Sequence, residues 1–126
     1  MNMLTQLFAG LTALILVVVF VLEVFFHHRK ELYSFTLIEP DDVPAVRMWA
    51  INTGFYNLTY GLGLLTGLVL LHTPWVEAGR ALVLFGCAAH IVLGIVLYFS
   101  ERRLWTSALL QSTPPLIAVL AYLLWG

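Results

Sequence analysis

Six polar residues of this 126-residue chain stand inside long apolar stretches, and their side chains can form hydrogen bonds or transfer protons. Such groups are costly to bury in lipid and usually face a bundle interior or a cavity. We therefore predict that they line one ligand-binding pocket. The residues are Glu23, Asn52, Tyr56, Asn57, His90 and Gln111.

The pair Glu23 and His90 raises the alternative of a membrane-embedded enzyme, because a carboxylate and an imidazole can act as general acid and base on a lipid-like substrate. At about 1.5 Å of helix rise per residue, the two side chains differ in depth by roughly 10 Å, which disfavours direct contact. No nucleophile motif accompanies them. The sequence therefore assigns no catalytic residue and favours a non-enzyme.

No metal or cofactor is expected. The single cysteine, Cys87, excludes a centre built on several thiolates. A cation site in the first loop is a weaker interpretation, because helix capping and solvated charge explain each of its residues. They are His27, His28, Glu39, Asp41 and Asp42.

Four apolar runs must position the six polar residues. The chain is 61% hydrophobic and 10% charged, whereas a soluble domain carries roughly a quarter charged residues. Each run has the length of about 20 residues that crosses a bilayer, where the backbone must be helical to satisfy its own polar groups. The short joins predict an all-α, antiparallel four-transmembrane-helix bundle as a single domain over 1–126. The expected helices are about 3–26, 45–71, 78–99 and 104–125.

Each expected helix has one stripe of small or polar residues, the pattern of a membrane bundle that packs through such residues. Asn57 lies about 90° from the direction of Asn52 and Tyr56, so either Gly54 loosens the helix or Asn57 faces a different neighbour. The stripes are Thr5, Thr12, Leu16 and Glu23; Asn52, Tyr56, Thr59, Gly63 and Gly67; Gly86, His90 and Gly94; and Ser107, Gln111, Pro115, Ala118 and Tyr122.

Two further local features concern the pocket. Pro114 and Pro115 lack the N–H groups that would bond the carbonyls of Leu110 and Gln111, so we expect the last helix to bend there and offer acceptors to the pocket. For Glu23, two simpler roles stay open: its carboxylate reaches the headgroups, or it pairs with an arginine of the third loop, Arg102 or Arg103.

The basic residues predict the orientation. Arg80 stands alone near one set of helix ends, and the five others lie near the first and third loops. Under the positive-inside rule, these loops are cytoplasmic and both termini lie outside. A net charge of −1 and the lack of a basic patch argue against a nucleic-acid partner. The five residues are Arg29, Lys30, Arg47, Arg102 and Arg103.

Several motifs resemble those of a known family. They are Leu22-Glu23-Val24-Phe25, Asn52-Thr53-Gly54-Phe55-Tyr56-Asn57, Tyr98 and Gln111-Ser112-Thr113-Pro114. Over nearly its whole length the chain resembles the bacterial membrane family known as domain of unknown function 1304. Thr53 stands where the family has Gln, Ser112 where it has Gly, and Leu16 where many members have His. The last departure weakens any role that needs a His–Glu pair on the first helix. The resemblance implies four helices and the bacterial inner membrane, and it implies no activity.

The expected function is to bind or transport a small lipophilic molecule through a polar pocket in the cytoplasmic half of the bundle. A carboxylate near one membrane surface, with amides at similar depth, favours this interpretation. The alternative is an accessory subunit of a larger membrane complex, or a homo-oligomer, since the chain is apolar and has almost no soluble part. In each case the lipid bilayer is an expected partner.

Overall fold

The computed structural model describes residues 1–126, and every regular element in it is a helix. The predicted runs agree with the observed helices to within a few residues. The long helices are α1 (Met3–Phe25), α3 (Val43–Leu70), α4 (Val76–Ser100) and α5 (Trp105–Trp125). A short helix, α2 (Tyr33–Thr36), lies in the first loop, residues 26–42, and 3₁₀ turns cover Lys30–Leu32, Pro40–Asp42 and Arg102–Leu104.

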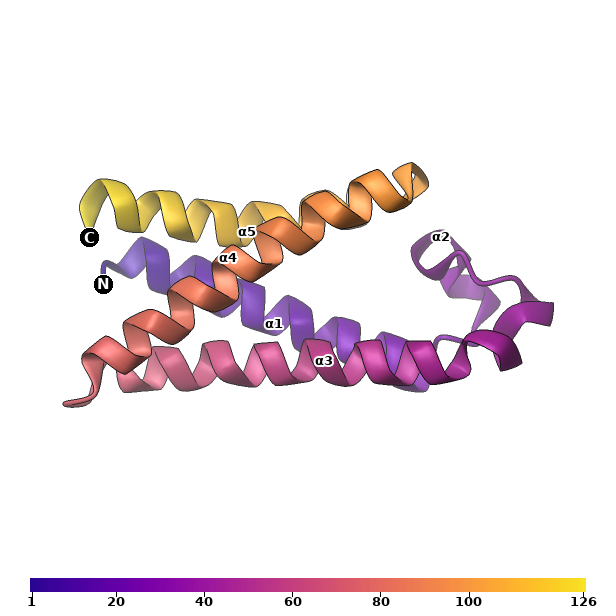
Figure 1. Ribbon diagram of the computed structural model, residues 1–126, viewed down its shortest axis with the longest axis horizontal. Coiled ribbons are helices and arrows are strands. Elements are labelled where there is room, and N and C mark those ends of the chain that lie inside the picture. Colours follow the sequence, from indigo (N-terminus) through magenta and orange to yellow (C-terminus); the bar gives the residue numbers. More distant parts are fainter.

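Each long helix packs against two others, so that α1 contacts α3 and α5, and α4 contacts the same two helices. The two termini lie side by side at one end (Figure 1), where the backbone N–H of Asn2 donates to the carbonyl of Gly126 at 3.0 Å. We call this end, which also carries the α3–α4 turn, the termini end. The opposite end, with residues 26–42 and the Arg102–Leu104 turn, is the loop end.

Small residues close the termini end. A Cβ atom on Gly79 would lie 2.6 Å from the carbonyl oxygen of Gly67 and 2.8 Å from the backbone nitrogen of Leu71. Only glycine allows α3 and α4 to approach so closely there. The buried core continues from this contact through seven residues, four of them Ala or Cys. They are Ala9, Ala13, Leu16, Leu64, Val83, Cys87 and Ala118.

The helices separate toward the loop end. In Figure 1, α4 starts beside α3 at the termini end and rises away from it along its length, while α1 starts near α5 and comes to lie along α3 toward the loop end. The contact between α1 and α3 depends on Gly54, where a Cβ atom would lie 2.5 Å from Cγ2 of Val24. The fold therefore combines a tight end with an open end.

Three helices are long and apolar enough to cross a membrane: Met3–Phe25, Val76–Ser100 and Arg102–Trp125. The prediction of membrane-spanning helices is supported for these three. Helix α3 has 28 residues but is less apolar, because it carries Arg47 and the amides of Asn52 and Asn57. Large apolar side chains are exposed around the three helices, as lipid contact requires. Examples are Leu7, Leu14, Val18, Phe85, Val92, Leu116, Leu120 and Leu123.

The interior face of α3 differs from the predicted stripe. Asn52, Tyr56 and Thr59 are exposed, and nothing lies within 4 Å of where Gly63 would carry a Cβ atom. The buried positions are Gly54, Gly61, Leu64 and Gly67. Close backbone approach at glycines sets the rotation of this helix, and the polarity of its side chains does not. On the other helices, Thr5, Thr12, Leu16, Gly86, His90, Gly94, Pro115 and Ala118 are buried as predicted.

Helix α5 continues through Pro114 and Pro115, and both side chains are buried in the bundle. The two prolines have no N–H for the carbonyls of Leu110 and Gln111. A bend at this point stays a prediction.

Candidate functional site

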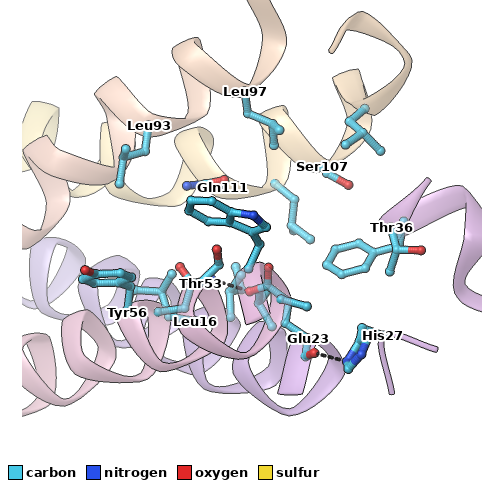
Figure 2. A pocket seen from close by; sticks show the side chains of 18 of the residues that line it. Leu16, Glu23, His27, Thr36, Thr53, Tyr56, Leu93, Leu97, Ser107 and Gln111 are labelled. Carbon is cyan, nitrogen blue, oxygen red and sulfur yellow. Dashed lines mark hydrogen bonds between the residues drawn. The ribbon is translucent and has the colours of Figure 1, made fainter. Parts of the chain in front are cut away.

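A cavity of about 700 Å³ fills the space where the helices separate at the loop end. Figure 2 shows side chains of α1 and α3, such as Glu23 and Thr53, facing those of α4 and α5, such as Leu97 and Gln111. Of its 23 lining residues, 15 are hydrophobic. Phe35, Thr36 and Ile38 of the first loop contribute to the lining from the loop end. The volume lies within the range of roughly 300–1,000 Å³ typical of small-molecule sites.

The carboxylate of Glu23 lines this cavity and is held by α3. The amide Nδ2 of Asn57 donates to Oε1 of Glu23 at 2.5 Å. This contact explains why Asn57 points about 90° away from Asn52 and Tyr56: it faces α1. The interpretation that Gly54 loosens the helix is not needed, since Gly54 lies in a regular helix packed on α1.

No cation of the chain pairs with Glu23. The structure has two ion pairs, Arg80 with Glu77 at 2.7 Å and Arg103 with Glu101 at 2.9 Å. Hydrogen bonds from Arg103 lower the pKa of Glu101 to about 2, so this carboxylate stays ionised at physiological pH. The guanidinium of Arg102 lies 5.6 Å from the ring centroid of Tyr98. The expectation that Glu23 pairs with Arg102 or Arg103 is therefore wrong for this structure.

Gln111 also lines the cavity, and its side-chain amide forms no hydrogen bond with the protein. The amide thus presents a donor and an acceptor to whatever occupies the space. Tyr56 lines the cavity too, although its side chain is largely exposed.

This geometry predicts the effect of replacing Gln111 by leucine. A lost partner would cost about 1–3 kcal/mol, but Gln111 has no protein partner to lose. We therefore expect Gln111→Leu to leave the free energy of unfolding unchanged or slightly higher, and to weaken ligand binding. Thermal unfolding in mild detergent tests the first part. A clear loss of stability would show that the amide has a structural partner after all.

Two predicted residues do not reach the cavity. Asn52 is exposed on α3, where its amide donates to the carbonyl of Met48 in its own helix at 2.8 Å. His90 is completely buried in α4, with Nδ1 2.9 Å from the carbonyl oxygen of Gly86 and Nε2 without a partner. Its ring meets the ring of Tyr60, a cavity-lining residue, edge to face at 5.0 Å between centroids. His90 therefore lies behind the cavity wall, which removes the geometric basis for an acid–base pair with Glu23.

Other lining residues were not predicted as pocket residues. Trp49, Thr53 and Tyr60 share a face of α3 with Asn57, at spacings of three to eight residues. Taking Asn57 as the inward direction would have found all three. Ser107 lies one turn before Gln111 on α5 and on the stripe predicted for that helix, although it was not predicted as a pocket residue.

His27 is nearly fully buried and lines the cavity instead of joining a cation site. Its Nδ1 lies 2.8 Å from the carbonyl oxygen of Glu23. Since a carbonyl only accepts, Nδ1 carries the hydrogen of this bond. Glu39 instead accepts a hydrogen bond from the hydroxyl of Tyr33 at 2.9 Å. No group of three or more His, Cys, Asp or Glu side chains is arranged to hold a metal ion.

A family model described as a protein of unknown function (DUF1304) matches residues 10–123. This range contains every residue that lines the cavity, from Ile15 to Gln111. No curated protein and no solved structure matches the chain. The family match confirms the resemblance seen in the sequence motifs, and we conclude that the chain belongs to the DUF1304 family.

Proposed function

We propose that this protein binds a small lipophilic molecule in the cavity at the loop end and handles it within the membrane, as a binding or transport protein. One observation carries the proposal. A mostly apolar cavity of about 700 Å³ contains a carboxylate without a cation, on Glu23, and an amide without a protein partner, on Gln111.

Unpaired polar groups in an apolar space are unfavourable, so buried polar atoms are normally hydrogen-bonded. A ligand with an apolar body and one polar group would satisfy both parts of the cavity. Its body would contact side chains such as Leu16, Leu93 and Leu97, and its polar group would meet Glu23 and Gln111.

We further propose that all four long helices cross a bacterial inner membrane as one domain. Helix α3, at 28 residues, is about 42 Å long at 1.5 Å per residue, which exceeds a hydrocarbon core of about 30 Å. Its exposed polar side chains bond their own helix, since Thr59 donates to Phe55 at 2.8 Å and Thr66 to Leu62 at 2.7 Å. Such bonds lower the cost of facing lipid.

The orientation follows from the basic residues, five of which stand at the loop end. The positive-inside rule then places the loop end in the cytoplasm and both termini outside. In this arrangement the cavity opens toward the cytoplasm or the inner leaflet.

Filling the cavity tests the binding proposal. Ser107 lines the cavity, and its neighbour Thr106 is exposed and does not. We expect native mass spectrometry of the purified protein to detect a co-purifying small molecule on the wild type and on Thr106→Trp. Ser107→Trp should lose it. Equal retention by both variants would contradict binding in this cavity, and so would the absence of any bound molecule from the wild type.

One observation favours a second role, as an accessory or self-associating subunit. The exposed stripe of α3 carries Asn52, Thr59 and Gly63, and polar or small residues on an outer helix face are typical of contacts between membrane helices. The mass of the protein in mild detergent separates the two roles, because a monomer with bound ligand supports the first and a defined complex supports the second.

A further inference from the structure

The cavity lining contains one carboxylate, that of Glu23, and no lysine or arginine. We infer that its occupant is an amphipathic amine, whose ammonium group pairs with Glu23 and whose apolar tail extends toward Tyr60 and Leu93. This inference rests on the proposed binding function and names the chemical class of the ligand.

Glu23 is the only Asp, Glu, Lys or Arg among the 23 lining residues. Its Oε1 accepts from Asn57, while Oε2 has no hydrogen bond and is not among the fully buried atoms. A carboxylate in an apolar setting requires a cation or several donors. The chain supplies one amide donor, so the remaining oxygen is free to receive the N–H of an ammonium group.

The cavity disfavours an anionic head for the same reason. No lysine or arginine lines it. Arg47 follows the lining residue Val46 but is exposed, and two other basic residues near the lining segments have partners elsewhere. Arg103 forms hydrogen bonds with Glu101 through both Nε and Nη2. Arg29 lies over the ring of Phe26, 5.7 Å from its centroid. A carboxylate or phosphate in the cavity would therefore meet like charge without compensation.

The aromatic content of the cavity also suits a cation. Phe35, Trp49 and Tyr56 line the same cavity as Glu23. Aromatic faces attract ammonium groups, and several of them together form the common recognition surface for organic cations.

A second hollow, entirely apolar, lies next to the cavity. It has a volume of about 360 Å³ and lies on α3 and α4, and all six of its lining residues are hydrophobic. Tyr60 and Leu93 line both this groove and the cavity, so they form the wall between the two. The groove continues past Phe85, Ala88 and Val92, whose side chains are exposed on the outside of α4. An alkyl tail directed toward this wall would leave the head near Glu23.

Three ligands that differ only in the head group test the inference: dodecylamine, dodecanol and dodecanoate. We expect the wild type in phosphatidylcholine nanodiscs to bind the amine at least about tenfold more tightly than the alcohol, a difference of about 1.4 kcal/mol. Dodecanoate should bind most weakly. Glu23→Gln should bind amine and alcohol equally, because glutamine keeps an acceptor for Asn57 and removes only the charge.

Glu77→Gln is the matched control, since Glu77 is an exposed carboxylate at the termini end, paired with Arg80 outside the cavity. It should keep the preference for the amine. Binding of dodecanol to Glu23→Gln shows that this variant is folded.

Each outcome separates the two proposals. Equal binding of amine and alcohol by the wild type, or an amine preference that survives Glu23→Gln, overturns the inference and leaves lipophilic binding intact. If no ligand binds the wild type more tightly than Ser107→Trp, the binding function itself fails. Competition with phosphatidylethanolamine identifies the source of the ammonium group: displacement points to a lipid headgroup, and its absence points to a free amine.

Discussion

Replacing Gly79 by alanine is expected to lower the free energy of unfolding by about 3 kcal/mol, the upper part of the usual range for overpacking. The new Cβ atom would lie 2.6 Å from the carbonyl oxygen of Gly67 and 2.8 Å from the nitrogen of Leu71. Both are backbone atoms, which cannot move away as a side chain can. Helices α3 and α4 must therefore separate at the termini end, where their contact closes the bundle.

The thiol of Cys87 can report unfolding in this experiment. Cys87 is the only cysteine and is completely buried, so a thiol-reactive fluorophore reacts with it when the protein unfolds. Gly63→Ala is the matched control, because nothing lies within 4 Å of the new Cβ atom. Alanine is favoured over glycine inside a helix by roughly 0.5–1 kcal/mol. Equal unfolding of the two variants would show that α3 and α4 do not meet at Gly79.

Replacing Asn57 by leucine is the second change with a large expected effect. Leucine has nearly the shape of asparagine but cannot donate to Oε1 of Glu23, the contact made at 2.5 Å. An acceptor left without its donor costs about 1–3 kcal/mol, and more when it is charged. We expect a loss of stability in this range, measured by chemical unfolding in detergent. The loss should be smaller in a Glu23→Ala background, with a coupling of about 1 kcal/mol between the two sites.

Asn52→Leu tests whether any amide on α3 would behave in this way. Asn52 is exposed and bonds only to the carbonyl of Met48 in its own helix. Leucine is preferred at a lipid-facing position, so this variant should be as stable as the wild type or more stable. If the two variants lose equal stability, the geometry assigned to Asn57 is incorrect.

The positions of the long helices could be predicted from the sequence because apolar length alone determines them. The run predicted at 3–26 ends one residue later than the observed helix, Met3–Phe25. The run predicted at 104–125 begins one residue earlier than the observed helix, Trp105–Trp125. Helix α3 begins at Val43, two residues before the prediction, after the turn at Pro40–Asp42. The polar residues of α3 interrupt its apolar run, so the start of the helix could not be placed from apolar length alone.

The pocket residues were only partly predictable, because the inward-facing side of α3 was inferred from polar residues that do not face the interior. Polar character suggested that Asn52 faces inward, whereas the glycines at 54 and 61 decide which face meets α1. Once Gly54 faces α1, Asn57 follows on the same side and Asn52 turns outward. Four of the six residues predicted for the pocket line the cavity, namely Glu23, Tyr56, Asn57 and Gln111, and their role in binding a ligand stays a prediction.

The separation of α4 from α3 could not be derived from one sequence. It depends on the tight contact at Gly79, which lets the two helices cross and then diverge, and such an angle is a property of the pair of helices. His90 shows the consequence. Its residue type and its place on the small-residue face of α4 correctly predicted an interior position. At that depth, however, the ring of Tyr60 separates it from the cavity.

Accessibility of single cysteines in the membrane tests the cavity most directly. In a Cys87→Ser background, Ser107→Cys places a thiol in the cavity lining, and Leu109→Cys places one on the outer face of the same helix. In the proposed orientation, a charged, membrane-impermeant maleimide should label Ser107→Cys rapidly in inside-out vesicles. It should label Leu109→Cys much more slowly, because lipid covers that position. If Ser107→Cys reacts no faster than Leu109→Cys from either side of the membrane, the bundle has no water-accessible cavity at the loop end.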